Sequence, residues 1–232
     1  MKKILAITLA RAGSKRIKKK NIKQFNGKPL ISHTIKAALE SKKINRYIVS
    51  TDSKEIAKIS KFYGAEIPFM RPIELAKDNT SDFLALKHAL EQMNNIYNYQ
   101  PDIIVNLRAT SPFRNGRIID RAINKFLSSK ADLLRTVSKV EGVHHPYWMY
   151  KINKNDYANQ FVKKININAY YQSQKLPDIY RLNGLVDIYK RESIYKNKIL
   201  NGKMITLVTS DSISHDIDTI SDFKFAESLT KK

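Results

Sequence analysis

Short apolar runs alternate with amphipathic segments through the first three fifths of the chain. The apolar runs have the length of buried strands and cover residues 3–9, 46–51, 65–69, 103–107 and 133–137. Between them, apolar side chains fall on one helical face in residues 30–39, 55–63, 83–93 and 116–127. Strands that alternate with helices through short connections are typical of a parallel, doubly wound α/β sheet.

The alternation breaks between residues 141 and 181. This segment is polar with weak periodicity, apart from the aromatic clusters at residues 144–150 and 169–172. One interpretation is an arm that packs against a second subunit, because Tyr, Trp and Met are enriched in interface cores. A loop packed on its own domain is the alternative, and the pattern leaves both open.

Strand character returns at residues 183–189 and 204–208, and a final helix follows Ser221 and Asp222. We find no internal repeat and no linker of the kind that separates domains. We therefore expect a single domain over residues 1–232, with an arm inserted at about residues 141–181.

Charge is the unusual feature of the composition. The formal net charge is +21, which is compatible with a polyanionic partner such as nucleic acid, acidic lipid or an anionic substrate. Lysine is spread along the chain together with many Ile and Asn, however, which indicates a compositional bias more than a designed surface. The sequence has no cysteine, no signal-peptide pattern and no apolar stretch of membrane-spanning length. We expect a cytoplasmic protein.

The first loop is the strongest candidate for chemistry. A strand at residues 3–9 is followed at once by Gly13, Ser14 and several cations, among them Arg11, Lys15 and Lys20. Ligands of open α/β sheets bind at the carboxyl ends of strands, where backbone N–H groups and cations can hold a polyphosphate. The loop matches neither the Walker A pattern nor Gly-x-Gly-x-x-Gly. A solvated charge run or a nucleic-acid surface remains the alternative.

Two aspartates near the other end of the chain suggest a metal. Asp216 and Asp218 are two residues apart, so in an extended segment both carboxylates point to the same side. Mg²⁺ favours a few carboxylates together with water and phosphate oxygens. Opposite a cationic loop, such a pair suits nucleotidyl transfer. Alternatively, Asp216 caps a turn and Asp218 caps the helix that follows.

Taken together, the motifs resemble one known family. They are residues 9–15 with Lys20 and Asn21, Arg71-Pro72 with residues 74–76, the Thr110–Arg114 segment, and Asp216-Ile217-Asp218, supported by residues 49–52 and 181–184. In this order, and over nearly the whole chain, they are similar to those of the acylneuraminate cytidylyltransferases. These are the CMP-sialic acid synthetases and their bacterial relatives for legionaminic and pseudaminic acids.

The resemblance implies a Rossmann-like, mostly parallel sheet flanked by helices, with the irregular segment as a small dimerisation excursion. It implies that CTP lies over the first loop, with Arg11 and Lys20 on its phosphates. Arg71 would lie by the cytidine, and Asp216 and Asp218 would bind Mg²⁺. The remaining nucleotide-binding residues would be Ala12, Gly13, Ser14, Lys15 and Asn21, and the catalytic set Arg11, Lys20 and Asp218.

The reaction implied is attack by the anomeric 2-hydroxyl of a nonulosonic acid on the α-phosphorus of CTP, releasing pyrophosphate. The sugar site would comprise Arg108, Thr110, Ser111, Arg181 and Asn183, with cations near Arg181 and Asn183 for the sugar carboxylate. A homodimer is expected, with neither nucleic acid nor membrane as a partner.

Two departures from the family bear on the acceptor. Where the family carries glutamine before Pro-Thr-Ser-Pro, this chain has Arg108-Ala109, and Ser173 replaces an arginine ahead of the Gln-x-Leu-Pro segment. The sugar is therefore left as a nonulosonic acid of unspecified decoration. The alternatives are a nucleotidyltransferase for 3-deoxy-octulosonate or a sugar 1-phosphate, a basic nucleic-acid-binding module, and a subunit with a dead site.

Overall fold

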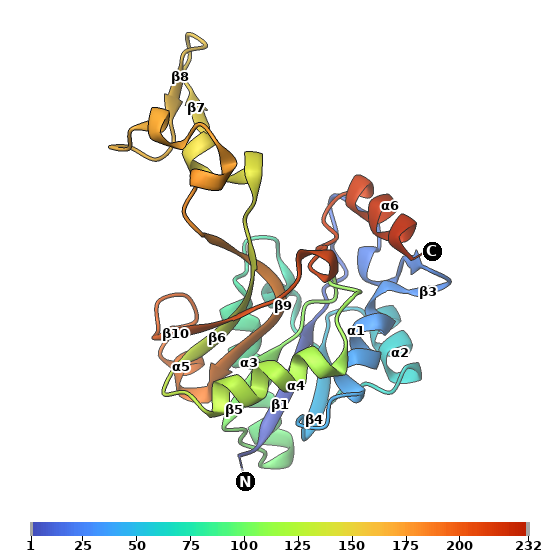
Figure 1. Ribbon diagram of the computed structural model, residues 1–232. Coiled ribbons are helices and arrows are strands. Elements are labelled where there is room, and N and C mark those ends of the chain that lie inside the picture. Colours follow the sequence, from blue (N-terminus) through green and yellow to red (C-terminus); the bar gives the residue numbers. More distant parts are fainter. Residues whose placement is uncertain (1, 231–232) are drawn as a thin grey trace.

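A six-stranded sheet forms the centre of the protein, whose computed structural model describes residues 2–230 (Figure 1). Its strand order is β10-β6-β9-β5-β1-β4. The strands are β1 (Ile4–Leu9), β4 (Arg46–Ser50), β5 (Ile103–Asn106), β6 (Leu133–Lys139), β9 (Tyr180–Lys190) and β10 (Met204–Val208). β9 pairs antiparallel with β5 and β6, and the other pairings are parallel. The expected mostly parallel sheet flanked by helices is confirmed.

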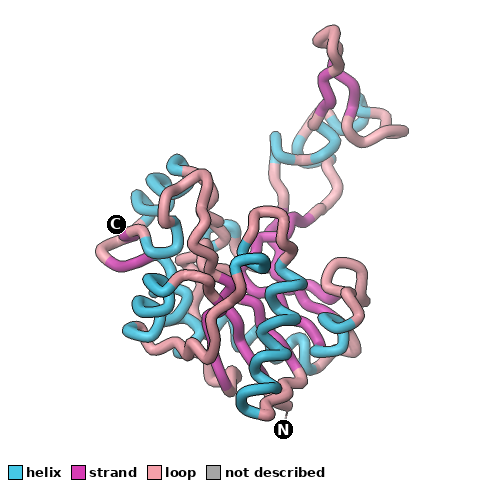
Figure 2. Tube along the Cα trace, turned by 180° about the vertical axis from the view of Figure 1, so that it is seen from behind, coloured by secondary structure: helices cyan, strands magenta, loops and turns pink. Residues whose placement is uncertain are grey.

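Helices cover both faces of this sheet because its central strands are apolar on both sides (Figure 2). In β1, Ile4 and Ala6 join one core cluster, whereas Leu5 and Ile7 join the other. The first cluster is closed by α1 (Leu30–Leu39), α2 (Lys54–Phe62) and α4 (Gly116–Leu127), and the second by α3 (Asp82–Tyr97) and α5 (Arg191–Tyr195).

The carboxyl-terminal helix belongs to a third, smaller cluster. Phe223 and Ala226 of α6 (Ile220–Leu229) pack with Ile17, Phe25 and Ile217. This cluster joins the end of the chain to the first loop, which contains the 3₁₀ helix η1 (Lys20–Ile22), and to the short hairpin of β2 (Gln24–Phe25) and β3 (Lys28–Pro29). The two segments with predicted chemistry are thus brought side by side by apolar packing.

One predicted strand is wrong. Residues 65–69 form no strand, and only an isolated bridge between Ile48 and Glu66 extends the sheet beyond β4. Pro68 lies in this stretch, and a proline cannot donate the hydrogen bond that a continuing ladder needs. The chain then passes through the 3₁₀ helix η2 (Ile73–Ala76) into α3.

The irregular segment projects from the body of the protein (Figures 1 and 2). It contains a small hairpin of β7 (Tyr150–Ile152) and β8 (Ala158–Gln160), and the 3₁₀ turns η3 (Gly142–His144), η4 (Pro146–Trp148), η5 (Ile167–Tyr170) and η6 (Ser173–Lys175). Its own contacts hold it, such as the bond from the Trp148 indole to the Tyr170 carbonyl at 2.8 Å. Ile152 and Tyr157 are each 71% exposed. The segment extends away from the body of the protein, and its role as an arm for dimerisation stays a prediction.

No helix within residues 2–230 is both long enough and apolar enough to cross a bilayer.

Candidate active site

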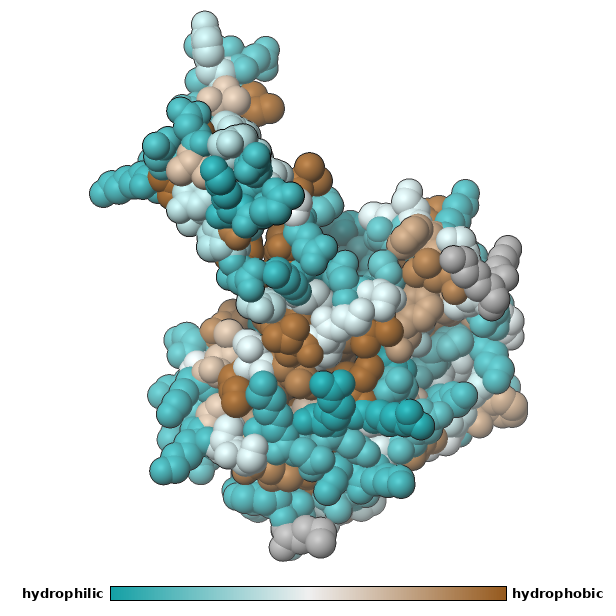
Figure 3. All heavy atoms as spheres, viewed as in Figure 1, coloured by the Kyte–Doolittle hydropathy of each residue, from teal (hydrophilic) through white to brown (hydrophobic). Residues whose placement is uncertain are grey.

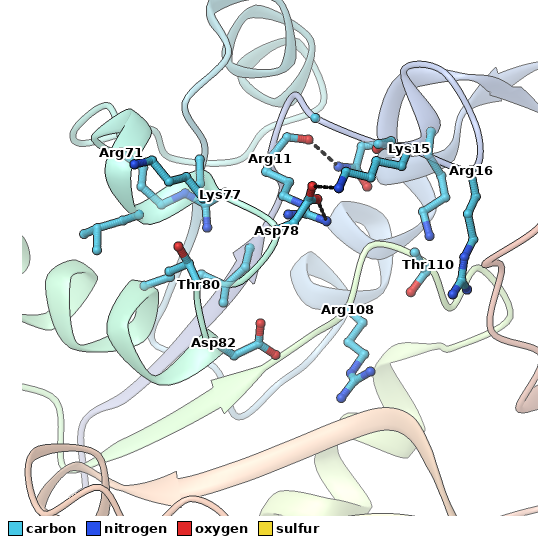
Figure 4. A pocket seen from close by; sticks show the side chains of 18 of the residues that line it. Arg11, Lys15, Arg16, Arg71, Lys77, Asp78, Thr80, Asp82, Arg108 and Thr110 are labelled. Carbon is cyan, nitrogen blue, oxygen red and sulfur yellow. Dashed lines mark hydrogen bonds and ion pairs between the residues drawn. The ribbon is translucent and has the colours of Figure 1, made fainter.

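A cavity of about 530 Å³ lies at the carboxyl ends of β1 and β5 (Figure 4). The first loop forms one wall and residues 75–82 form the other, with the segments after β5 and before α6 completing it. The residues with chemistry that line it are Arg11, Gly13, Ser14, Lys15, Arg16, Lys20, Asn21, Arg71, Lys77, Asp78, Thr80, Ser81, Asp82, Arg108, Thr110 and Asp218.

The first loop is held in shape by hydrogen bonds at two points. The Asn21 side chain donates to the Arg11 carbonyl at 3.0 Å, and the Ala12 N–H donates to Asp52 Oδ1 at 2.8 Å. The loop residues expected around the nucleotide line the cavity, with one exception. Ala12 is not part of the lining, because its N–H is directed to Asp52 just beyond the neighbouring strand β4.

Lys20 joins the first loop to the acidic segment. Its Nζ donates to the Ile217 carbonyl at 2.7 Å and to Asp218 Oδ1 at 2.9 Å. Thr219, in a capping box with Asp222, caps α6, so Asp218 is not the helix cap that the alternative interpretation required. The expected juxtaposition of a cationic loop and Asp218 across one cavity is present.

Asp216 lies behind this wall of the cavity and does not line it. Ile217 points into the third core cluster, whereas Asp216 is half-buried and its Oδ1 has no hydrogen-bond partner among the described residues. The buried Arg114 guanidinium is a nearby charge, and burial lowers the pKa of Arg114 to about 10.

We tested whether these carboxylates fit the expected Mg²⁺. Residues 2–230 hold no group of three or more His, Cys, Asp or Glu that would form an all-protein metal site. Asp216, with an unsatisfied oxygen, and Asp218, which is exposed on the cavity two residues later, are nevertheless donors of the kind preferred by a cation that takes its other ligands from phosphate and water. The Mg²⁺ assignment stays a prediction.

Arg71 has the features of a ligand-binding residue. Its side chain is 6% exposed and lines the cavity, yet Nε and Nη2 lack partners among the described residues. Burial lowers the pKa of Arg71, and the nearby Asp52 and Asp82 oppose this. Because buried polar groups are normally paired, unpaired guanidinium nitrogens at a cavity wall indicate a missing partner.

The wall of residues 75–82 was not predicted to carry chemistry. Asp78 forms ion pairs with Arg11 at 2.8 Å and with Lys15 at 2.5 Å, so a carboxylate stands between two of the proposed phosphate ligands. The hydrogen bond from Lys15 is the largest cause of a lowered pKa of Asp78. The only sequence signal was the position of this acid between the Arg71 motif and the start of α3.

The residues predicted for the sugar separate into two groups. Arg108 and Thr110 line the cavity, and Ser111 is buried beneath it. Arg181 instead pairs with Asp211, and the Asn183 amide donates to Ser138 at 2.9 Å and Thr209 at 2.7 Å; neither lines the cavity. The structure therefore gives Asn183 hydrogen bonds within the sheet, and the roles of Arg181 and Asn183 in binding the sugar stay predictions.

Comparisons with known proteins identify the family. A family model described as cytidylyltransferase matches residues 5–231. The CMP-N,N'-diacetyllegionaminic acid synthase of Legionella pneumophila is 35% identical, over 98% of this chain and 96% of the relative. The pseudaminic acid cytidylyltransferase of Campylobacter jejuni is 32% identical, over 99% and 97%.

Solved structures share the fold. A CMP:2-keto-3-deoxy-manno-octonic acid synthetase complexed with CTP superimposes with a TM-score of 0.74 at 16% identity, covering 98% of each chain. The family match and the full-length relatives confirm the resemblance seen in the sequence, and this chain belongs to the cytidylyltransferase family of enzymes.

Proposed function

We propose that the protein transfers CMP from CTP to the anomeric 2-hydroxyl of a nonulosonic acid and releases pyrophosphate. The observation that carries this proposal is the cavity in which Arg11, Lys15 and Lys20 face Asp218. The names of the full-length relatives support the class of acceptor, since they act on legionaminic and pseudaminic acids.

The chain contributes mainly positioning and positive charge. Arg11, Lys15 and Lys20 hold the triphosphate and stabilise the charge that develops on the pyrophosphate as it leaves. The hydroxyl oxygen forms a bond to the α-phosphorus, the bond from that phosphorus to the bridging oxygen of the β-phosphate breaks to release pyrophosphate, and the hydroxyl proton passes to water. Asp216 and Asp218 would hold Mg²⁺, which when bound neutralises phosphate charge and lowers the pKa of the hydroxyl.

The arm supports a homodimer as part of this proposal. Figure 3 shows an arm that is mostly hydrophilic with scattered apolar side chains, and among its large exposed side chains are Val143, Ile152 and Tyr157. Such side chains are typical of protein interfaces. Light scattering on the wild type and on I152D/Y157D should give a dimer and a monomer, respectively. The cytoplasm, where CTP is available, is the expected location.

Pyrophosphate release tests the reaction. CTP and Mg²⁺ are supplied with sialic, legionaminic or pseudaminic acid, with 3-deoxy-octulosonate and with a sugar 1-phosphate; ATP, GTP and UTP serve as controls. We expect turnover with CTP and at least one nonulosonic acid. Preference for 3-deoxy-octulosonate or a sugar 1-phosphate, or for another nucleotide, would contradict the proposal.

A variant links this activity to the cavity. Asp218→Ala should lower turnover by at least about 10- to 100-fold while CTP binding is retained, because changes even to the supporting residues of a metal site have effects of this size. Glu192→Ala is the matched control, because Glu192 is an exposed acid of α5 outside the cavity. Near-normal turnover of Asp218→Ala would remove the predicted role of this residue.

A further inference from the structure

Arg108 is a cation of the cavity that does not belong to the first loop. It follows β5, and its side chain is 39% exposed. Within residues 2–230 the guanidinium makes no hydrogen bond, and Nε is buried without a partner. Figure 4 shows Arg108 directed away from Arg11 and Lys15, and Arg108 also lines a side cavity together with Asp82.

Asp187 and Gly184 constrain the position of the Arg108 guanidinium. Asp187 in β9 is 2% exposed and lies 3.9 Å from Arg108 Nη2, while Arg135 binds the same carboxylate at 2.9 and 3.2 Å. Gly184 makes room at the side. Its φ is +68°, and a Cβ there would lie 3.0 Å from Arg108 Cδ. Arg108 is thus held in place without its hydrogen-bonding capacity being used.

The Arg135–Asp187 pair is neutral, so the charge that this group presents to the cavity is the +1 of Arg108. Across a side cavity of about 160 Å³, Asp82 also faces this space and has no ion pair or hydrogen bond from its side chain in the described part of the chain. Asp82 would repel a phosphate dianion more strongly than a carboxylate monoanion, and it can accept hydrogen bonds from hydroxyl or N–H donors that neighbour the carboxylate.

We propose that Arg108 binds the carboxylate of the acceptor sugar acid and, with Asp82, selects a 2-keto acid over a sugar 1-phosphate. This inference rests on the proposed function. It replaces the expectation that cations near Arg181 and Asn183 bind the carboxylate. The forked guanidinium is the side chain best suited to bind a planar carboxylate through two hydrogen bonds.

A cycle that changes both residue and substrate tests the proposal. The substrates are the best nonulosonic acid from the panel and its C1 carboxamide, and the variants are Arg108→Gln and Arg108→Lys. In the wild type, loss of the carboxylate should lower kcat/KM by about 10- to 100-fold, the range for a hydrogen-bonded charge. Arg108→Gln should cause a similar loss with the acid, with little further loss with the carboxamide and a KM for CTP within about twofold of the wild type.

Arg108→Lys should recover part of the loss, since it keeps the charge but not the fork. Arg117→Ala, at an exposed position of α4, is the control and should match the wild type. Two results would overturn the role of Arg108. One is a loss of kcat/KM in Arg108→Gln that is as large with the carboxamide as with the acid, and the other is a rise of its KM for CTP by the same factor. If the wild type binds CTP in calorimetry but uses no nonulosonic acid, the proposed function fails instead.

Discussion

Replacing Asp187 by Asn should destabilise the protein strongly. The carboxylate is buried and receives two hydrogen bonds from Arg135, with Arg108 close by. Burial acts to lower the pKa of Arg135, but the hydrogen bond to Asp187 and its charge outweigh this, so the pKa is raised. Asn has nearly the same volume as Asp but lacks its negative charge, and its NH₂ group would face the N–H donors of the Arg135 guanidinium. Removing one partner of a buried pair costs about 3–5 kcal/mol.

Urea denaturation at pH 7 measures the difference in the free energy of unfolding, and thermal denaturation measures the corresponding fall in Tm. For a chain of this length, each 1 kcal/mol lowers Tm by about 2–4 °C, so a fall of about 6–20 °C is expected. Asp178→Asn is the matched control, because Asp178 pairs with Lys139 at the surface and exposed pairs contribute at most about 1 kcal/mol. If Asp187→Asn lies within 1 kcal/mol of the wild type, the buried charge network does not stabilise the sheet as argued.

Three further changes test separate parts of the site and its support. Lys20→Met removes the charge that contacts Asp218 and should lower kcat by about 10²–10³-fold in the pyrophosphate assay; a loss below tenfold would contradict its role. Asp78→Asn frees Arg11 and Lys15 from their ion pairs and should tighten the binding of CTP and CDP a few-fold in calorimetry while leaving the binding of CMP unchanged. An equal gain for CMP would show that the outer phosphates do not displace Asp78 from these cations. Burial, opposed by the hydrogen bond to Phe25, lowers the pKa of His33, so the unfolded state binds the proton more readily. The free energy of unfolding should therefore fall as pH decreases through about 6.5, and His33→Gln should flatten that fall; an unchanged slope would assign it to other groups.

The fold was predictable where local pattern and tertiary demand agree. The apolar run at residues 4–9 must be covered on both faces, and the helical stripe of residues 30–39 can cover one of them. Residues 65–69 have an apolar character too, but Pro68 interrupts the ladder. The direction of β9 was a different problem: its strand character could be read from the residues, but its antiparallel direction depends on where the arm returns the chain to the body.

The site was predictable where function requires a particular side chain on a loop. Arg11, Lys20 and Asp218 follow from the chemistry of a triphosphate, and they meet on the cavity. Asn183 could not be placed in the same way, because its partners Ser138 and Thr209 come from other strands. Asp78 and Asp82 were missed for the same reason: only the fold brings the start of α3 opposite the first loop.

The distribution of charge, and not its total, distinguishes a nucleotide enzyme from a nucleic-acid-binding protein. The net charge of +21 is compatible with either. The cavity lining has seven cations (Arg11, Lys15, Arg16, Lys20, Arg71, Lys77, Arg108) and three carboxylates (Asp78, Asp82, Asp218), a balance of +4. A nucleoside triphosphate carries about four negative charges at neutral pH. A nucleic-acid surface would need its cations along an open face, with no carboxylates interrupting the path of the backbone. Here Asp78 and Asp218 neutralise part of the charge inside a concave site, which suits a compact anion better than an extended nucleic-acid backbone.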